Sequence, residues 1–471
     1  MRPVERGKHR DVDEAARLPV ETGPRPDLPP AVLGHELRAE HLAPRAKPFF
    51  VETTRHRDTS FRPNRHNLAH VLSLPPLLRQ PGFRLFWLGV AFTQIGSRAT
   101  AAANLWQIQD LTDSIFAVGV VSLVEGVAVI GIAPLGGTIA DRMDRKRLLQ
   151  IAQGAALLSS IVLAITTFTN TITPLWIYAA TAVVSGAATF DTPARQALIP
   201  ALVPRDRLID AYALIQPLGN LARLVGPAIA GLLIAGWGVG AVYVFDVVTY
   251  AGLIASLAFV AFGRYELGPP QHWWHSVLEG LRYVRGKPLI WQLMALDLAA
   301  VFFAAYRVVL PALARDVFVV GAQGYGFLAA VPALGGIVGA AIVYRLRRMP
   351  RKGLLVLLAT MAYAIAAIGL GYAPTFALAL VLAGALGLFD AITTTIRQAV
   401  VQLETPDRLR GRVTSLYQMS ARGGPALGQA QLGALATALG APLALAVGGA
   451  LTLGYAAWLA LTGTTVRDYE A

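Results

Sequence analysis

The residues of this chain that could do chemistry are ionisable side chains embedded in long apolar stretches. They are Arg98, Glu125, Arg223, Asp246, Asp297, Arg307, Asp390, Arg397 and Arg422. A charge at the centre of a bilayer costs about 2.5–3.5 kcal/mol on insertion scales, so charges there serve pairing, proton transfer or contact with a transported molecule. The apolar stretches contain no histidine, the chain has no cysteine, and no Gly-x-Ser-x-Gly sequence occurs. We therefore expect neither an enzyme nor a metal site.

Glu125 and Asp297 are the candidates for proton coupling. Glu125 lies away from both ends of its apolar stretch, where a low dielectric favours the neutral form of a carboxyl group. Alternatively, Glu125 neutralises Arg98 on the preceding stretch, and that pairing favours the ionised form instead. Other members of the set are expected to be structural, with Asp246 at the membrane interface and Arg223 and Arg422 as counter-charges in helix packing.

The elements that must position these residues are membrane-spanning helices. The chain is 55% hydrophobic and only 15% charged, its mean hydropathy is +0.52, and apolar runs of about 20 residues recur, which is the length that crosses a bilayer. We expect an all-α polytopic membrane protein with twelve transmembrane helices. Their expected ranges are 84–109, 115–140, 147–169, 173–199, 208–236, 240–263, 289–316, 325–345, 353–373, 376–402, 410–438 and 441–463.

Basic residues are confined to alternate connections between these spans. They gather around residues 141–147, 205–207, 264–287, 345–352 and 408–412, whereas the other connections carry almost none. Because basic loops stay inside, both termini are expected to face the cytoplasm in a multi-pass protein of the inner or plasma membrane. The net charge of +13 is then explained by these loops and by anionic lipid, so lipid is an expected partner and nucleic acid is not.

An internal repeat divides the chain into two halves. Phe190-Asp191, Arg195-Gln196, Pro204, Asp206-Arg207-Leu208 and Gly226-Pro227 recur about 200 residues later as Phe389-Asp390, Arg397-Gln398, Pro406, Asp407-Arg408-Leu409 and Gly424-Pro425. A half-length repeat in a twelve-span chain predicts two pseudo-symmetric six-helix bundles with a substrate site between them. The expected organisation is a disordered cytoplasmic tail (1–80), an N-terminal bundle (81–263), a cytoplasmic linker (264–288), a C-terminal bundle (289–463) and a cytoplasmic tail (464–471).

The segments expected outside the membrane, the linker and the N-terminal tail, support two further predictions. In the linker, Ser276 and Glu279 form a capping-box pattern, and a short amphipathic helix on the inner leaflet is expected there. In the tail, residues 1–70 are either translated or precede a misassigned start, because a sequence typical of a first spanning helix begins near Arg79.

The loop between the second and third spans has an unusual spacing of acids and bases. Gly137, Asp141, Arg142, Arg145 and Lys146 fill the slots of the signature that joins these helices in the major facilitator superfamily, which the chain resembles. Asp144 replaces the second glycine of the signature, a departure shared with the enterobactin (siderophore) exporter branch. A generic basic loop would explain the arginines but not the spacing of both aspartates. The resemblance covers roughly residues 80–463.

The resemblance implies a gate at the cytoplasmic side. In that superfamily the acid at the position of Asp141 braces the first bundle against the cytoplasmic end of helix 11 and holds the outward-facing state. Here Asp141 would meet the positive end of the helix that starts near Arg410, an interaction of about 0.3–2 kcal/mol. The second copy of the loop, Tyr344-Arg345-Leu346-Arg347-Arg348-Met349, has no acid.

Asp191 and Arg195 are also expected at this gate. They are four residues apart and pair on one helix face if Pro193 leaves that turn intact. Their expected role is to relay charge to Asp141 and Arg145, with direct substrate contact as the alternative.

Further candidates come from the helices that line the substrate cavity and the gate in the resembling fold. Gly226-Pro227 partly resembles the antiporter signature of drug exporters, although Ala230 replaces its next glycine, and these residues suit a gate or plain helix packing. Helices 1, 4, 7 and 10 line the cavity in that fold. The resulting cavity candidates are Gln94, Arg98, Asn104, Gln107, Arg307 and Asp390, together with Asp297.

These observations together predict a transporter. We expect a secondary active exporter of a small amphipathic molecule, a siderophore or other secondary metabolite, working by alternating access and proton antiport. A multidrug efflux pump and an importer of the same fold are the alternatives. No nucleotide-binding sequence is present, so the proton motive force rather than a cofactor is expected to drive transport, and the resemblance implies a monomer.

Overall fold

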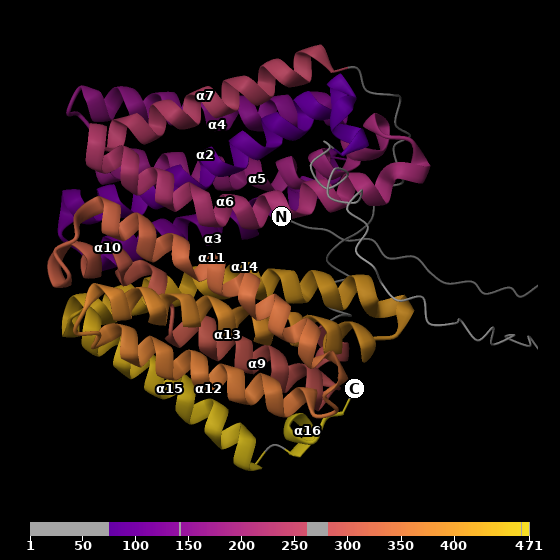
Figure 1. Ribbon diagram of the computed structural model, residues 1–471, viewed down its shortest axis with the longest axis vertical. Helices are drawn as coiled ribbons and strands as arrows, with labels where there is room; N and C mark the ends of the chain where they lie inside the picture. Colours follow the sequence, from indigo (N-terminus) through magenta and orange to yellow (C-terminus); the bar gives the residue numbers. More distant parts are fainter. Residues whose placement is uncertain (1–74, 141–142, 261–280, 463, 471) are drawn as a thin grey trace, which may run out of the picture. The chain divides into compact units, whose positions relative to one another are not determined.

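The computed structural model describes residues 75–140, 143–260, 281–462 and 464–470. Within these residues the regular structure is entirely helical (Figure 1). The first half contains η1 (Pro76–Arg79), α2 (Pro81–Thr112), α3 (Ile115–Ala140), α4 (Arg145–Phe168), α5 (Pro174–Leu202), η2 (Arg205–Arg207), α6 (Leu208–Trp237) and α7 (Val239–Phe259). The second half contains α9 (Pro288–Phe303), η3 (Tyr306–Val309), α10 (Leu310–Ala312), η4 (Leu313–Val317), α11 (Gly321–Arg345), η5 (Leu346–Arg348), α12 (Lys352–Gly371), α13 (Phe376–Leu403), α14 (Asp407–Leu439), α15 (Ala441–Thr462) and α16 (Thr464–Arg467).

Each expected span coincides with helical structure, but the span predicted over 289–316 is not one continuous helix. In the described part of the chain, nine segments are long and apolar enough to cross a membrane. The broken span consists of α9, the 3-10 turn η3, the short α10 and the π-helical η4. Pro311 explains the break, because a proline ring clashes with the carbonyl four residues earlier, which here belongs to Arg307. The expected span is therefore present, but it is not one continuous helix.

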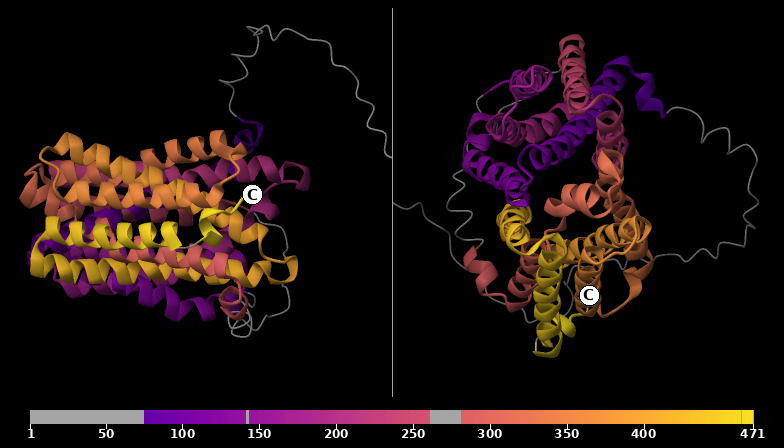
Figure 2. Two further views of the ribbon diagram at one scale, coloured as in Figure 1. Left: turned by 90° about the horizontal axis from the view of Figure 1, so that it is seen from below. Right: turned by 90° about the vertical axis from the view of Figure 1, so that its left-hand side faces the viewer.

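The helices form two groups that meet along two seams. α2–α7 form the N-terminal bundle and α9–α15 form the C-terminal bundle (Figures 1 and 2). The bundles contact each other mainly where α3 packs on α14 and where α6 packs on α11. Because α6 and α14 occupy equivalent places in the internal repeat, the two seams are related by the same pseudo-symmetry.

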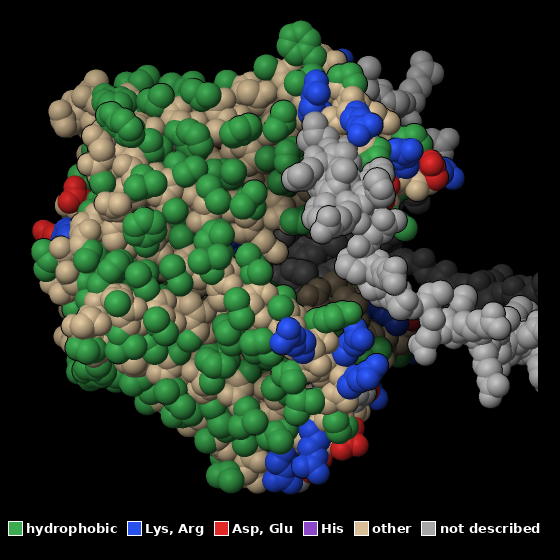
Figure 3. Space-filling model, in the orientation of Figure 1, with side chains coloured by type: hydrophobic (Ala, Val, Ile, Leu, Met, Phe, Trp, Pro, Cys, Tyr) green, Lys and Arg blue, Asp and Glu red, His purple; other side chains and the backbone are tan. Residues whose placement is uncertain are grey.

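Charge separates the two ends of the helices. The connections that follow α3, α5, α11 and α13 are rich in arginine and lysine, and these side chains gather at one end of the molecule, which we call the basic end (Figure 3). At the opposite end, residues 113–114, 169–173, 238, 372–375 and 440 connect the helices without any lysine or arginine. Between the ends the surface is largely apolar, as expected for helices that face lipid.

Segments at both termini of the described chain pack on the bundles at the basic end. Leu77 and Leu78 of η1 are buried in the apolar core of the N-terminal bundle, although the sequence placed them in the tail. At the C-terminus, the Tyr469 hydroxyl donates to Glu404 Oε1 at 2.8 Å. Burial and the neighbouring Glu404 raise the pKa of Tyr469 to about 12, so this hydroxyl keeps its proton, and hence its bond to Glu404, at neutral pH.

Each seam depends on glycines where the helix backbones touch. A Cβ atom at Gly231 of α6 would lie 2.7 Å from the carbonyl oxygen of Ala322 and 2.8 Å from Cα of Gly326, both on α11. In the other seam, a Cβ at Gly433 of α14 would lie 2.8 Å from the carbonyl oxygen of Ile115. Small residues of this kind let membrane helices approach closely. All these contacts lie towards the opposite end of the helices.

We predict that Gly231→Leu opens the α6–α11 seam, because the side chain would meet backbone atoms that cannot move aside, and overpacking costs about 1–3 kcal/mol. The chain has no cysteine, so spin labels can be attached directly to the substitutions Thr169→Cys and Tyr372→Cys. Both positions lie at the opposite end, one in each bundle. The label-to-label distance should lengthen in Gly231→Leu. Gly236→Leu on the same helix is the control, since no atom lies near its added Cβ, and an equal distance in both variants would contradict the prediction.

Candidate functional site

Charged side chains from both bundles form what we call the central cluster, near the middle of the helices. Its members are Arg98 on α2, Glu125 on α3, Arg223 on α6, Arg307 on η3 and Asp390 on α13. All of them are solvent-exposed. Arg98 interacts electrostatically with Arg223, Arg307 and Glu125, and Arg223 interacts with Arg307 and Asp390. Charges that are both solvated and close enough to act on one another face a common solvent-accessible space between the bundles.

The central cluster is predominantly cationic. Its three arginines and two carboxylates leave one formal positive charge, since 3 − 2 = 1. Although the charges of Glu125 and Arg98 interact, no salt bridge joins them among the residues that the structure describes. Arg223, predicted to be a counter-charge in helix packing, has an exposed side chain and interacts electrostatically with Asp390. Guanidinium groups at such a place are suited to binding carboxylates, phenolates or phosphates.

Next to the cluster, Asp297 and Arg397 form a buried ion pair inside the C-terminal bundle. Asp297 Oδ1 on α9 lies 2.7 Å from Arg397 Nη2 on α13, and only 8% and 4% of the two side chains is exposed. Arg397 also donates to the Tyr417 hydroxyl of α14 at 3.2 and 3.3 Å. A small cavity with Asp390 in its wall adjoins the pair.

In the N-terminal bundle, Asn104 and Gln107 belong to the interior rather than to the shared space. They are 7% and 5% exposed. The Tyr243 hydroxyl of α7 lies 3.0 Å from Asn104 Oδ1 and 2.6 Å from Gln107 Oε1. In this conformation they lie on a different face of α2 from Arg98, and their place in the substrate cavity stays a prediction. Gln94 is partly exposed and close to α6, where a Cβ at Gly219 would lie 3.5 Å from Gln94 Oε1.

Asp246 contradicts its predicted place at the membrane interface. It is 1% exposed and lies on α7 against α2 and α4. Ser160 Oγ of α4 donates to Asp246 Oδ2 at 2.8 Å. The apolar sequence around Asp246 gave no sign of these hydroxyl neighbours, which come from helices distant in sequence.

Two of the predicted gate residues pair as their spacing indicates. α5 continues through Pro193, and Asp191 forms a salt bridge with Arg195 four residues later. Asp191 Oδ1 also accepts a hydrogen bond of 2.6 Å from Gln153 Nε2 of α4, a partner that the sequence did not reveal.

The loop residues near the basic end have local structural roles. Asp144 caps α4, because its Oδ1 accepts from the Arg147 backbone N–H at 2.9 Å, and α4 begins at Arg145. Lys146 Nζ donates to the Val260 carbonyl at 3.0 Å. Gly226 lets α6 lie directly on α2, since its Cβ would be 2.5 Å from the Arg98 Cβ, and the Pro227 carbonyl faces Gly326 of α11. Helix packing therefore occupies both Gly226 and Pro227 in this conformation.

Some of the predicted residues are not among those that the structure describes. The structure does not describe Asp141, Arg142, the Ser276–Glu279 capping box of the linker or the Arg422 side chain. Gly137 lies in the last turns of α3. The predicted contact of Asp141 with α14 remains a prediction. α14 begins at Asp407 rather than near Arg410, and Asp407 pairs with Arg410 at 2.7 Å, so an acid already occupies its first turn.

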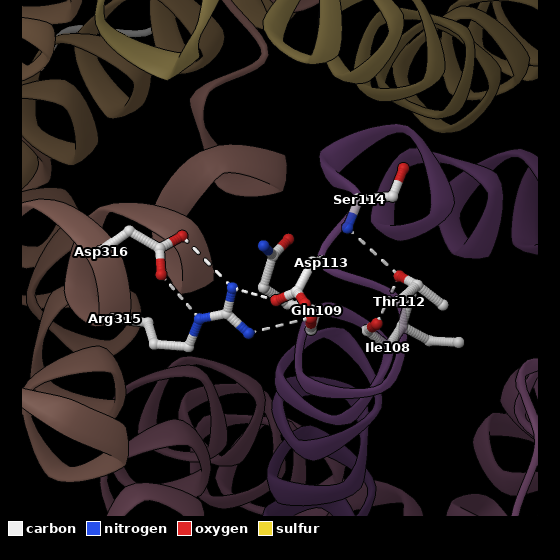
Figure 4. Close-up of polar contacts among 7 residues, drawn as sticks. All are labelled: Ile108, Gln109, Thr112, Asp113, Ser114, Arg315 and Asp316. Atoms are coloured by element: carbon white, nitrogen blue, oxygen red, sulfur yellow. Dashed lines mark hydrogen bonds and ion pairs between the residues drawn. The ribbon is translucent and has the colours of Figure 1, made fainter.

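A charged contact between the bundles at the opposite end was not predicted. Figure 4 shows Arg315 reaching from η4 to the end of α2. Its Nη2 lies 2.5 Å from Asp113 Oδ1 and its Nη1 donates to the Gln109 carbonyl at 3.1 Å, while Asp316 holds its Nε at 2.7 Å. We call Arg315, Asp113 and Asp316 the latch. The sequence did contain a signal for this contact. Charges of opposite sign stand at the ends of two spans, on the side where the other connections lack basic residues.

We predict that breaking the buried pair with Asp297→Asn destabilises the protein by about 3–5 kcal/mol, because Arg397 is left buried without a counter-charge. Thermal unfolding in detergent, followed by circular dichroism, measures this effect. The double variant Asp297→Asn/Arg397→Gln should recover most of the stability. Equal stability of the single variant and wild type would show that the pair does not hold α9 to α13.

We further predict that Arg315→Ala weakens closure at the opposite end. Exposed ion pairs contribute about 0.2–1 kcal/mol, so the open population should rise about 1.4- to fivefold at low salt and less at high salt. The spin labels at Thr169→Cys and Tyr372→Cys report this population. Asp316→Asn is the matched control, since it removes a partner within η4 and leaves the contact with Asp113. An identical response of the two variants would show that the contact between bundles is unimportant.

Comparison with known proteins places this arrangement in a family. A family model described as transmembrane secretion effector matches residues 72–471. The enterobactin exporter EntS of Shigella boydii serotype 18 is 32% identical over 371 residues, which cover 78% of this chain and 88% of that protein. EntS of Escherichia coli O127:H6 gives the same values.

Solved structures share the fold at low sequence identity. The nucleoside transporter NupG matches with a TM-score of 0.68 and 13% identity, covering 81% of this chain and 99% of its own. A bacterial homologue of the human lysosomal transporter Spinster, in an inward-facing and unoccupied conformation, matches with a TM-score of 0.61 and 15% identity, covering 83% and 96%. Two helical bundles, a charged space between them and a family match over the whole described chain agree: the protein belongs to the transmembrane secretion effector family of major facilitator transporters.

Proposed function

We propose that this transporter exports an anionic, amphipathic small molecule of the siderophore class from the cytoplasm. The observation that carries the proposal is the excess of arginine in the central cluster, where Arg98, Arg223 and Arg307 come from three elements of both bundles. An anionic chelator would replace the repulsion among these guanidinium groups with attraction, whereas a cationic drug would add to it. The names of the relatives, which export enterobactin, support the same substrate class.

The distribution of charge supports an orientation of the protein in the membrane. Basic loops resist translocation, so the basic end is assigned to the cytoplasm of a cell-membrane protein. Both seams and the latch close the opposite end in this conformation, which leaves the basic end as the route by which solvent reaches the central cluster. Alternation would then require the latch and seams to separate while the predicted Asp141 contact closes the cytoplasmic side.

Proton antiport is the proposed source of energy, with no cofactor. Glu125 competes with a bound anion for Arg98, because both are negative charges acting on one guanidinium group. Protonation of Asp297 would remove the counter-charge of Arg397 and free that guanidinium group to turn towards Asp390 in the adjoining cavity. Either event couples proton binding to a change in the charge that the substrate meets.

The experiment uses acid-inside everted membrane vesicles and a pH dye. Addition of enterobactin should dissipate the proton gradient in wild type, and a cationic dye such as ethidium should not. Arg98→Gln, Arg223→Gln and Arg307→Gln should each weaken the apparent affinity about tenfold or more, because a hydrogen bond to a charged group contributes about 1.5–3 kcal/mol. The matched control is Arg348→Gln, which removes an exposed guanidinium group at the basic end and should leave transport unchanged.

The alternatives predict different results. A multidrug pump would respond to ethidium and lose that response in Glu125→Gln or Asp390→Asn. An importer would take up enterobactin into right-side-out vesicles rather than everted ones. No response to the siderophore in a folded, inserted protein would refute the proposed substrate class.

A further inference from the structure

Asp246 is a buried carboxyl group that belongs neither to the central cluster nor to the buried ion pair. It is 1% exposed and lies where α7 packs on α2 and α4. Among the described residues, no lysine or arginine forms a salt bridge with it. An isolated ionised carboxylate is strongly disfavoured in so apolar a place, and such a group becomes neutral instead. Asp246 therefore differs from Asp297, which has a guanidinium partner.

Only one oxygen of the Asp246 carboxyl group accepts a short hydrogen bond. Oδ2 accepts from Ser160 Oγ at 2.8 Å. Thr249 Oγ1 is 3.5 Å from Oδ1 but 2.9 Å from the Asp246 carbonyl, and its single proton goes to the nearer acceptor. Oδ1 rests directly against α2, since a Cβ at Gly96 would lie 2.7 Å from it. In this conformation Oδ1 therefore receives a weaker hydrogen bond than Oδ2 does.

A neighbouring hydroxyl lacks a partner of its own. Thr100 Oγ1, which is buried on α2 beside this carboxyl group, makes no hydrogen bond of ordinary geometry. A hydroxyl oxygen can accept a proton that a neutral carboxylic acid donates. One proton on Asp246 would remove the charge, and the carboxylic acid would then donate to Thr100 Oγ1.

The groups that face Asp246 from each packed element are uncharged. α2 presents Gly96 and Thr100, α4 presents Ser160, and α7 itself presents Thr249 and the phenols of Tyr243 and Tyr250 one turn away on either side. The Tyr250 hydroxyl lies 2.9 Å from Ser97 Oγ, and Ser97 is partly exposed beside Arg98. This hydroxyl pair offers a route between Asp246 and the solvent around the central cluster.

α2 also touches the C-terminal bundle, so its packing on Asp246 is connected to the seam. The Tyr325 hydroxyl of α11 donates to the Ala102 carbonyl at 3.0 Å, its ring stacks on Trp106 with centroids 5.5 Å apart, and the latch holds Asp113 at the end of α2. When the seams separate, α2 loses these partners. A shift of α2 would move Gly96 and Thr100 away from the carboxyl group.

We propose that Asp246 is a proton-binding site inside the N-terminal bundle, neutral in the conformation described here and deprotonated when α2 shifts on opening of the opposite end. In that step the carboxyl O–H bond breaks, its electron pair stays on the carboxylate, and water in the space between the bundles takes the proton. Only the use of this proton for antiport rests on the proposed function. Binding and release of the proton need no substrate.

Infrared spectroscopy of the purified full-length protein tests the site directly. At neutral pH, wild type should show the C=O band of a neutral carboxylic acid, and Asp246→Asn should lose it. Ser160→Ala should shift the band to higher frequency, because the C=O group loses its hydrogen bond, and this variant assigns the band if Asp246→Asn fails to fold. Asp297→Asn is the matched control and should leave the band unchanged, since Asp297 has a guanidinium partner in Arg397 at 2.7 Å.

The second measurement follows the proton on opening. In Gly231→Leu the band should be lost from the opened protein, and a pH dye should register about one more proton released per molecule than in wild type. Absence of the band from wild type would overturn the proposal, because Asp246 would then be ionised. A band that persists in the opened protein would also overturn it, because Asp246 would be a permanently neutral structural acid. Neither result depends on whether enterobactin is transported.

Discussion

The cost of placing charge in a lipid bilayer is the constraint on which the rest of this structure depends. The chain meets this cost in three ways. Arg98 and the other members of the central cluster are solvated in the space between the bundles. Asp297 and Arg397 compensate each other within one bundle. Asp246 has only hydroxyl neighbours, a setting that suits a neutral acid. Each arrangement confines the charge to a different environment, and each responds differently to protonation.

The solvated arrangement exists because the bundles touch along narrow seams of small residues rather than over their whole facing surfaces. Glycines at positions such as Gly231 and Gly433 bring helix backbones into contact towards one end only. The mid-helix arginines are thereby left exposed. Close packing at one end and hydration at the centre are thus two consequences of the same helix arrangement, and a movement that separates the seams must also change the surroundings of α2.

The two ends of the molecule use charge for different purposes. Charged residues near the basic end make local contacts, as Asp144 and Lys146 show. The few charges of the opposite end form a contact between bundles through Arg315. An exposed pair of this kind is weak, so this contact between the bundles can break at little cost. The sequence repeat does not extend to this asymmetry, since the connection that follows the first span carries an acid, Asp113, and no base.

The sequence by itself determined the helical membrane class, the ranges of the helices, the family and the Asp191–Arg195 pair. These depend on composition, on apolar run length and on spacing within one helix, all of which are local properties. Only the tertiary structure decided which face of α2 is solvated, so that Arg98 is exposed while Asn104 is buried.

The partners of Asp246 and Arg397, and the latch, were likewise decided by the tertiary structure. They join helices far apart in the chain, and nearly uniform hydrophobicity hides which face of each helix meets its neighbour. The break in the span over 289–316 depended on both. Pro311 indicated the break locally, and only the fold gave the exposed Arg307 guanidinium group its place in the central cluster.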